Sequence, residues 1–279
     1  MKGLQRQALK RIGKNWSKAS LTRAKLRANV AEFGGYVTDQ FGLQKIENLK
    51  PGHIQSYVES LHMRGLAPST IANKMTAVRE IVASIGKKNI VARENVAYGI
   101  ERVRINPQSV DQAKLEEIRA VLQSRADRGE LAAKMMIAAD SLRTSFGLRA
   151  KESLMSKDII EKNGIMYLVV EGSKGGRPRE LAVNNEAKLK AVQLVKETSK
   201  SHGSGTGRII PPNMTLKQAY NKQRNEWRAL GGTRKNRGNM HGERHVHARE
   251  MCIRGASKAE IMCELGHGQD RSPSAYIGK

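Results

Sequence analysis

Three segments in the second half of the chain carry charged side chains and a tyrosine, residue types that act on phosphate groups. They are TSFGLRAKESL with Arg149 and Glu152, the turn Lys174-Gly175-Gly176, and a C-terminal series made of HGERH (241–245), LGH (265–267) and Tyr276. A phosphate ester gains negative charge in the transition state of its cleavage, so positive groups must stabilise it. Guanidinium groups suit this task because they are permanently charged and bind phosphate oxygens as a two-pronged fork. Arg149 and Arg244 are therefore candidates to stabilise such a transition state.

The order and spacing of these segments resemble the signature of the tyrosine recombinase (phage integrase) family. That signature has an arginine in G-L-R-x-x-E, a lysine in a β-turn, H-x-x-R-H, L-G-H, and a tyrosine nine residues further on. The residues that match are Arg149 and Glu152, Lys174, His241, Arg244 and His245, His267, and Tyr276. The segment GLAPSTIANKMTAVR is similar to the family's helical core-binding domain, so the resemblance covers nearly the whole chain.

The resemblance implies a site-specific DNA recombinase that cleaves and rejoins DNA strands. Tyr276 would be the nucleophile. The covalent 3′-phosphotyrosyl intermediate would conserve the bond energy, so neither ATP nor a metal or other cofactor is expected. The implied partner is double-stranded DNA, bound by a homo-tetramer on two DNA sites, and accessory DNA-bending proteins are further candidate partners.

The residue types suit separate roles in that reaction. A phenol has a pKa near ~10, so Tyr276 must lose its proton, and His241 is the candidate base because imidazole titrates near neutral pH. Lys174, on its glycine-flanked turn, is the candidate general acid for the leaving 5′ oxygen. His267 is expected to donate a hydrogen bond to a non-bridging phosphate oxygen. Two further matched residues are expected to orient these groups: Glu152 and His245.

Taken singly, the same residues have simpler interpretations. A lysine in a turn, a histidine on a basic helix or a tyrosine near a chain end is commonly a surface residue. A zinc site is another alternative, because histidines four residues apart share a helix face. Its candidate ligands are His241, His245, Cys252, Cys263 and His267. However, HGERH carries its glutamate one position later than the H-E-x-x-H motif, and the cysteine spacing matches no common zinc finger.

Two other functions use the same features. A type IB topoisomerase-like enzyme would nick and close DNA as a monomer through the same chemistry. A non-catalytic architectural protein would also bind DNA, but it would have no need for all five elements of the signature.

The charge balance favours a nucleic-acid partner. The 279 residues include 50 Lys and Arg against 26 Asp and Glu, a formal net charge of +24, and such a surplus indicates a densely negative partner. A membrane is not expected, because no apolar run approaches the ~18 residues of a membrane span; the best candidate, LAAKMMIAAD, is interrupted by Lys134 and Asp140. The two cysteines, Cys252 and Cys263, cannot form a disulfide framework and favour a reducing cytoplasm.

The first 100 residues show helical spacing and no strand-like alternation. Apolar stripes predict three helices, carrying Leu26, Val30, Phe33, Val37 and Phe41; Ile54, Val58 and Leu61; and Ile71, Met75, Val78, Val82 and Ile85. Ser69 or Thr70 is expected to cap the third helix, and Gly86 to end it. Residues 1–30 carry nine Lys and Arg and no acid, which suits either a disordered basic arm or a segment that contacts DNA.

The second part of the chain is expected to be mixed. After a linker at 106–110, Ser109 and Gln112 predict a capping box for a helix with Leu115, Ile118 and Leu122. A buried helix is expected at 131–146, and Arg149 and Glu152 are expected to open another. Three short apolar runs after Asp158, separated by Asn163-Gly164 and the Ser-Lys-Gly-Gly turn, predict a small antiparallel sheet. Helices resume near 186–198, a flexible loop is expected at 199–207, and the remainder from Leu216 reads as helical.

The predicted fold is mainly α with a small antiparallel β-sheet. A helical core DNA-binding domain over 1–105 would precede an α/β DNA breaking-rejoining catalytic domain over 106–279. Base edges carry sequence information, and Thr70, Asn73 and Lys74 near a helix start are candidates to read them. Only Ile277, Gly278 and Lys279 follow Tyr276, whereas many family members continue into a helix that docks on a neighbouring subunit. Assembly is therefore expected to use other surfaces, unless the chain is trimmed.

Overall fold

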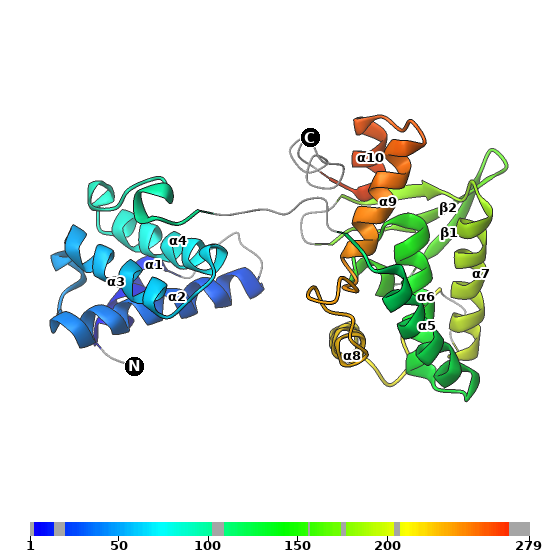
Figure 1. Cartoon of the computed structure of the whole chain (residues 1–279), viewed down its shortest axis with the longest axis horizontal. Coiled ribbons are helices and arrows are strands. Elements are labelled where there is room, and N and C mark those ends of the chain that lie inside the picture. Colours follow the sequence, from blue (N-terminus) through cyan, green and yellow to red (C-terminus); the bar gives the residue numbers. More distant parts are fainter. Residues whose placement is uncertain are drawn as a thin grey trace. The chain divides into compact units, whose positions relative to one another are not determined.

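Helices and one small sheet are divided between two compact units, Met1–Arg104 and Ile105–Lys279, in the computed structural model of the chain. The structure describes residues 3–13, 20–101, 109–155, 157–173, 177–203 and 207–267. Within these ranges, the strands all lie in the second unit (Figure 1). The predicted fold class, mainly α with a small antiparallel sheet, is confirmed.

The first unit is helical throughout its described residues. Its elements are α1 (Gly3–Ile12), α2 (Ser20–Phe41), η1 (Ile46–Asn48), α3 (Pro51–Met63), α4 (Pro68–Ser84), η2 (Lys88–Ile90) and η3 (Val96–Tyr98). The predicted apolar stripe of α2 is buried from Leu26 to Val37, and α2 packs on α4. The stripe stops one turn before its expected end: Phe41 is exposed at the end of α2, and its ring lies 4.7 Å from the ring of His53.

Two expectations for this unit were wrong. Of the two alternatives for residues 1–30, the disordered arm is wrong for residues 3–12, which form α1 because Leu4 and Ala8 give this basic segment an apolar face that is buried in the core. Contact of the segment with DNA stays a prediction. The cap of α4 is Ala67, because Pro68 begins the helix: its fixed φ suits the first helical position. Ser69 and Thr70 therefore lie within the first turn.

The second unit begins with two packed helices. Its elements are α5 (Gln112–Asp127), α6 (Leu131–Phe146), η4 (Glu152–Leu154), β1 (Asp158–Lys162), β2 (Ile165–Val170), β3 (Arg179–Ala182), α7 (Glu186–Ser201), α8 (Leu216–Ala229), α9 (Gly242–Ile253) and α10 (Lys258–Leu265). Helix α6 packs on α5, α7 and α9 (Figure 1), and most of its apolar residues from Met135 to Phe146 are buried in the main core of the unit. The predicted helix at 131–146 is confirmed.

The sheet is antiparallel in the order β1-β2-β3, with Ile160 opposite Tyr167 and Leu168 opposite Leu181. The predicted turn at Asn163-Gly164 joins β1 to β2, and both residues have positive φ, as this tight hairpin turn requires. The expected Ser-Lys-Gly-Gly turn lies largely outside the described residues, which stop at Ser173 and resume at Arg177.

Three local expectations for this unit were also wrong. Asp111 caps α5 by accepting from the backbone N of Lys114 at 3.1 Å, in place of the expected box from Ser109. Helix α7 continues to Ser201, because Val195, Thr198 and Ser199 bury its last turns. The segment with Arg149 and Glu152 forms a turn and the single 3-10 turn η4 in place of an α-helix.

Candidate active site

The turn that carries Arg149 begins where α6 ends at Gly147. Gly147 has a φ of 60°, in the left-handed region that favours glycine. A Cβ at this position would lie 2.6 Å from the His247 ring and 2.8 Å from Leu265. The end of α6 therefore fits closely against α9 and the end of α10, and this contact brings the G-L-R segment to the later motifs.

Glu152 is the carboxylate at the centre of the site, and its side chain is fully buried. Its Oε1 lies 2.6 Å from Nη1 of Arg149, and its Oε2 accepts from the backbone N of Arg149 at 3.0 Å. Burial alone would raise the pKa of Glu152, but the guanidinium groups of Arg179 and Arg149 lower it to about 2. Glu152 is therefore ionised at neutral pH and holds the Arg149 side chain in place.

Arg179, at the start of β3, is a third arginine in this site. Its Nη2 lies 3.2 Å from Oε2 of Glu152, and its Nε donates to the carbonyl of Glu264 at 2.8 Å. A Cβ on Gly266 would lie 2.6 Å from Nη1 of Arg179, so glycine lets the LGH turn sit directly on the guanidinium. Arg179 thus joins the sheet, the Arg149 turn and the end of α10.

Arg244 bridges the ends of α6 and α10 from the first turn of α9. Its side chain is fully buried, and the guanidinium donates to the carbonyls of Gly147 and Leu265 at 2.5 Å each. Its Nη2 also lies 2.9 Å from Nε2 of His267. These bonds fix the plane of the guanidinium between the G-L-R and L-G-H segments.

The protonation of His267 follows from its contact with Arg244. An arginine only donates hydrogen bonds, so Nε2 of His267 must accept and the ring proton must be on Nδ1. Burial, together with the positive charges of Arg244, Arg149 and Arg179, lowers the pKa of His267 to about 4. The ring is therefore neutral at physiological pH, and any hydrogen bond that it donates comes from Nδ1.

His241 and His245 lie together at the start of α9. His241 is the exposed N-cap residue, and its ring meets the buried ring of His245 edge to face at 5.2 Å. Burial, together with the neighbouring His241, lowers the pKa of His245 to about 4. His245 is thus neutral at physiological pH and supports the ring of the more accessible His241.

The side chain of Lys157 holds the η4 turn in place. Its buried ammonium donates to the carbonyls of Glu152 and, at 2.7 Å, Met155. Burial lowers the pKa of Lys157 to about 7, although the carboxylates of Glu152 and Glu171 oppose this shift.

The structure therefore brings together several of the predicted site residues that it describes. Arg149 binds Glu152, Arg244 contacts His267, and Arg179 links Glu152 to the end of α10, just before His267. His241 and His245 contact each other on either side of Arg244, at the start of α9. Lys174 and Tyr276 lie outside the described residues. Of the predicted DNA-reading residues, Thr70 and Asn73 are exposed on α4. Lys74 is buried, and its ammonium is ion-paired with Glu32, so it does not share their exposed face.

The sequence analysis gave no role to several charged residues that are buried, among them Arg143, Lys157, Arg179 and Glu243. Arg179 had a detectable signal, because it occupies the same side of β3 as the buried Leu181, whereas Glu180 is exposed. Arg143 had one too, since it falls on a helix between the buried residues Ala139 and Phe146. A charge at an inward position usually has a buried partner.

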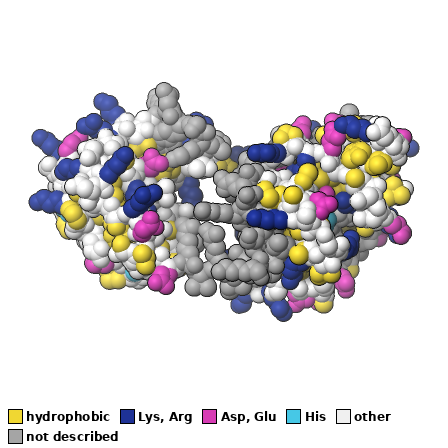
Figure 2. All heavy atoms as spheres, turned by 90° about the horizontal axis from the view of Figure 1, so that it is seen from above, with side chains coloured by type: hydrophobic (Ala, Val, Ile, Leu, Met, Phe, Trp, Pro, Cys, Tyr) yellow, Lys and Arg dark blue, Asp and Glu magenta, His cyan; other side chains and the backbone are white. Residues whose placement is uncertain are grey.

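Other kinds of site find less support in the described part of the chain. Across its ranges, no three His, Cys, Asp or Glu side chains gather as a metal site would require, and Cys252 and Cys263 are exposed. None of the helices described has the length and hydropathy that a membrane span requires. Lys and Arg side chains are spread over the visible surface of both units, with acidic side chains between them (Figure 2).

Comparison with known proteins gives matches over both units. An integrase family matches residues 104–250, and a phage integrase N-terminal domain family matches residues 1–91. No curated protein matches the chain.

Several solved structures share the fold. The XerH site-specific recombinase bound to difH substrate, in its pre-cleavage complex, has 19% identity and a TM-score of 0.65, covering 92% of this chain and 75% of its own. The lambda integrase tetramer bound to a Holliday junction has 15% identity and a TM-score of 0.70, covering 98% and 78%. A fragment of the Tn1549 transposon integrase in complex with circular intermediate DNA has 15% identity and a TM-score of 0.66, covering 99% and 95%.

The family match spans more than half of the chain, and the motif segments that it contains converge on one buried cluster of arginines, a carboxylate and histidines. The chain belongs to the phage integrase, or tyrosine recombinase, family.

Proposed function

We propose that the protein is a site-specific DNA recombinase that cleaves and rejoins strands through a 3′-phosphotyrosyl bond to Tyr276, without metal or ATP. The observation that carries this proposal is the placing of His267. Nη2 of Arg244 lies 2.9 Å from Nε2 of its ring, and the nearby Arg149 and Arg179 share the Glu152 carboxylate, so this cluster holds three guanidinium groups and one carboxylate. Such a surplus of fixed positive charge suits a phosphate that gains negative charge as it reacts. His267 lies nine residues before Tyr276 in the sequence.

The roles follow from the chemistry of each group. Arg149 and Arg244 bind the non-bridging oxygens, and Nδ1 of His267 donates a further hydrogen bond. His241, the accessible imidazole, takes the proton of the attacking phenol, and Lys174 supplies the proton to the leaving 5′ oxygen. Glu152 and His245 orient their neighbours. In this proposal residues 106–279 form the catalytic domain, and residues 1–105 form a helical domain that also binds DNA.

DNA as the substrate and a tetramer as the active assembly are supported by the related structures. XerH is bound to a recombination site, and lambda integrase is a tetramer on a Holliday junction. A homo-tetramer on two DNA sites is the assembly we propose for this chain, with accessory DNA-bending proteins as candidate additional partners.

The decisive experiment uses a suicide substrate nicked next to the cleavage site, which traps a covalent adduct. Candidate sites are inverted half-sites in the DNA that flanks the gene. The unaltered protein should give a denaturation-resistant complex with DNA, whereas Tyr276→Phe should bind the same DNA and give none. Tyr220→Phe is the matched control, because it removes a hydroxyl from the same unit at a half-buried position in α8.

The outcomes separate the candidate functions. An adduct in Tyr276→Phe would mean that another residue is the nucleophile. DNA binding with no adduct in any variant would favour a non-catalytic architectural protein. Relaxation of supercoiled plasmid by a monomer, with no joining of two sites, would favour a topoisomerase-like enzyme.

A further inference from the structure

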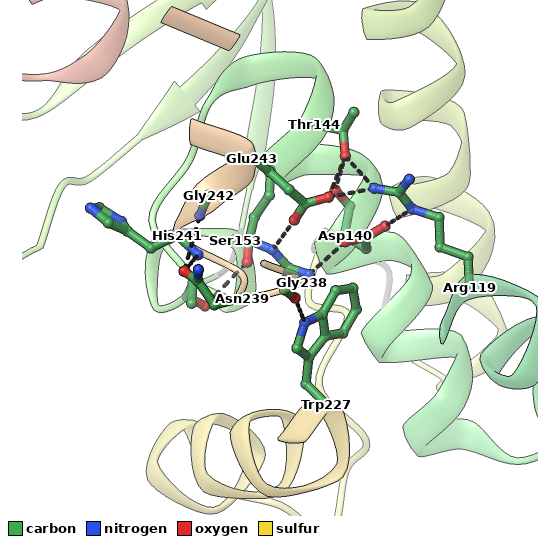
Figure 3. Close-up of polar contacts among 12 residues, drawn as sticks. Arg119, Asp140, Thr144, Ser153, Trp227, Gly238, Asn239, His241, Gly242 and Glu243 are labelled. Carbon is green, nitrogen blue, oxygen red and sulfur yellow. Dashed lines mark hydrogen bonds and ion pairs between the residues drawn. The ribbon is translucent and has the colours of Figure 1, made fainter. Parts of the chain in front are cut away.

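Glu243, the glutamate inside HGERH, lies outside the phosphate site. Residues three and four apart share one face of a helix, so His241, Arg244 and His245 point the same way. Glu243 follows His241 by two positions, which turns it toward another face. Figure 3 shows its carboxylate pointing away from the His241 ring and toward Thr144 and Arg119.

The carboxylate of Glu243 is buried among donors from two other helices. Its side chain is 3% exposed, and the neighbouring Arg143 is fully buried. Its Oε2 lies 3.2 Å from Nε of Arg143, and its Oε1 accepts from Thr144 Oγ1 at 3.2 Å and from Nη2 of Arg119. Helix α9 is therefore attached to α6 and α5 by directional, charged hydrogen bonds.

Asp140 of α6 closes the network. Its Oδ2 lies 2.7 Å from Nε of Arg119, and its Oδ1 lies 2.6 Å from Nη2 of Arg143. Two carboxylates thus share two arginines, and the formal charges cancel. Burial and the Asp140 carboxylate outweigh the two guanidinium groups, so the pKa of Glu243 is raised.

The same network reaches the loop that leads into α9. The guanidinium of Arg143 lies 5.0 Å from the centre of the Trp227 ring, and Trp227 Nε1 donates to the carbonyl of Gly238 at 2.7 Å. Asn239 Oδ1 then accepts from the backbone N atoms of His241 and Gly242 at 3.1 Å each (Figure 3). Arg143 therefore contacts groups that fix the start of α9 from both sides.

Stability alone is a weak explanation for such a network. Asp140, Arg143 and Glu243 are buried, whereas the Arg119 side chain is 32% exposed. Taking these charges out of water costs much of what their attraction returns, and well-packed apolar side chains would serve as well. Apolar packing has little directionality, so it does not fix the rotation of a helix about its axis. A network of hydrogen bonds with defined partners does fix this rotation.

We propose that Glu243 is a positioning residue, which sets the rotation of α9 so that His241 and Arg244 face the phosphate. This inference rests on the proposed function. A displacement of about 1 Å in a catalytic group can cost about 100-fold in rate, so the setting of this helix has direct consequences for cleavage.

The test compares Glu243→Gln with Glu226→Gln. Both changes remove a carboxylate from an ion pair in the same unit; Glu226 Oε2 pairs with Arg125 Nη2 at 2.8 Å, away from α9. The rate of single-turnover cleavage is measured at saturating DNA and divided by the concentration of folded, active protein. The affinity for DNA is measured separately. Glu243→Gln should lower the rate about 100-fold with affinity held, and Glu226→Gln should leave the rate unchanged. A normal rate per active molecule in Glu243→Gln, with only less folded protein, would overturn the proposal.

A second measurement does not depend on catalysis. Ring ¹H–¹⁵N spectra of the histidines report the surroundings of His241 and His245 in the absence of DNA. Their signals should move in Glu243→Gln and stay in place in Glu226→Gln. Unchanged signals in Glu243→Gln would refute the proposal that Glu243 positions α9. This outcome is independent of the proposed function, because it does not require that the protein forms a covalent adduct.

Discussion

The guanidinium of Arg244 is buried, yet it donates to the carbonyls of Gly147 and Leu265. A carbonyl oxygen accepts a hydrogen bond without carrying a full negative charge, so the arginine stays a source of positive potential. Glu152, by contrast, is shared by Arg149 and Arg179 and offsets one charge of the two. The site therefore combines fixed geometry with a net positive field, which is what electrostatic stabilisation of a phosphoryl transition state requires.

At the residue scale, the first prediction separates leaving-group protonation from charge stabilisation. Lys174→Ala should lose cleavage on ordinary DNA while keeping most of its affinity. A 5′-bridging phosphorothiolate substrate should restore most of the rate, because a thiolate leaves without a proton. The same substrate should not rescue Arg244→Ala, which lacks charge on the non-bridging oxygens; that loss should be about 10²–10³-fold in rate. Equal rescue of both variants would remove Lys174 from the acid role.

The second prediction follows from the two histidines with lowered pKa. Both His245 and His267 have a pKa of about 4 in the folded protein, against an ordinary value of 6.5. Below pH 6.5 the unfolded chain binds protons that the two folded-state histidines do not, so their contribution to the free energy of unfolding should fall between pH 6.5 and about 4 and then level off. Unfolding is followed by Trp227 fluorescence in a Trp16→Phe background.

The test variant combines His245→Gln with His267→Gln. The control is His62→Gln, which replaces an exposed histidine in α3. The double variant should flatten the pH dependence, and His62→Gln should leave it unchanged. An equally steep fall in the double variant would assign the acid sensitivity to other groups.

At the scale of elements, the ends of helices bring the motif segments together. Gly147 caps the C-terminus of α6 and Gly266 caps that of α10. Both are in the left-handed conformation, and each lies against a side chain from another segment. The backbone that follows each glycine carries a site residue, Arg149 or His267. The helix ends are thus part of the candidate site. Each of their glycines is required for two reasons: the backbone is left-handed, and a Cβ would clash with a neighbouring side chain.

A third prediction tests this double constraint with Gly266→Ala and Gly255→Ala. Both glycines have positive φ, but a Cβ on Gly255 would meet nothing within 4 Å, whereas one on Gly266 would lie 2.6 Å from Arg179 Nη1. Gly255→Ala should cost only the left-handed strain of about 1–2 kcal/mol in the free energy of unfolding. Gly266→Ala should cost more and should also slow cleavage by displacing Arg179. Equal destabilisation in urea titrations, with cleavage intact, would contradict this account.

The sequence predicted the elements better than it predicted their boundaries or buried charges. The helix at 131–146 and the Asn163-Gly164 turn have strong local signals, an apolar run and a turn dipeptide, and both are confirmed. The start of α4 was wrong because Pro68 outweighed the capping residues after it. Local patterns could not reveal that Arg143 pairs with Glu243, since these residues are 100 positions apart and charged side chains are exposed by default.

At the scale of the whole molecule, the basic surplus is divided equally between the units. Met1–Arg104 carries 19 Lys and Arg against 7 acids, and Ile105–Lys279 carries 31 against 19, so each has a formal charge of +12. The active-site arginines account for only a few of these charges. A positive potential of similar size on both units favours a DNA duplex that contacts both of them.

The last prediction concerns the salt dependence that this division implies. Phosphate contacts release counterions, so the logarithm of the affinity should fall with the logarithm of salt concentration by about 0.9 for each contact. For binding by both units we expect roughly six or more contacts, hence a slope of about −5 or steeper. Replacing the exposed Lys25 and Arg27 of α2 with Gln should reduce the slope by up to about 2 if DNA contacts this face. The matched control replaces Lys196 and Lys200, exposed on α7 in the second unit. If the slope for the unaltered protein is shallower than about −2, most of the basic surplus does not serve DNA binding.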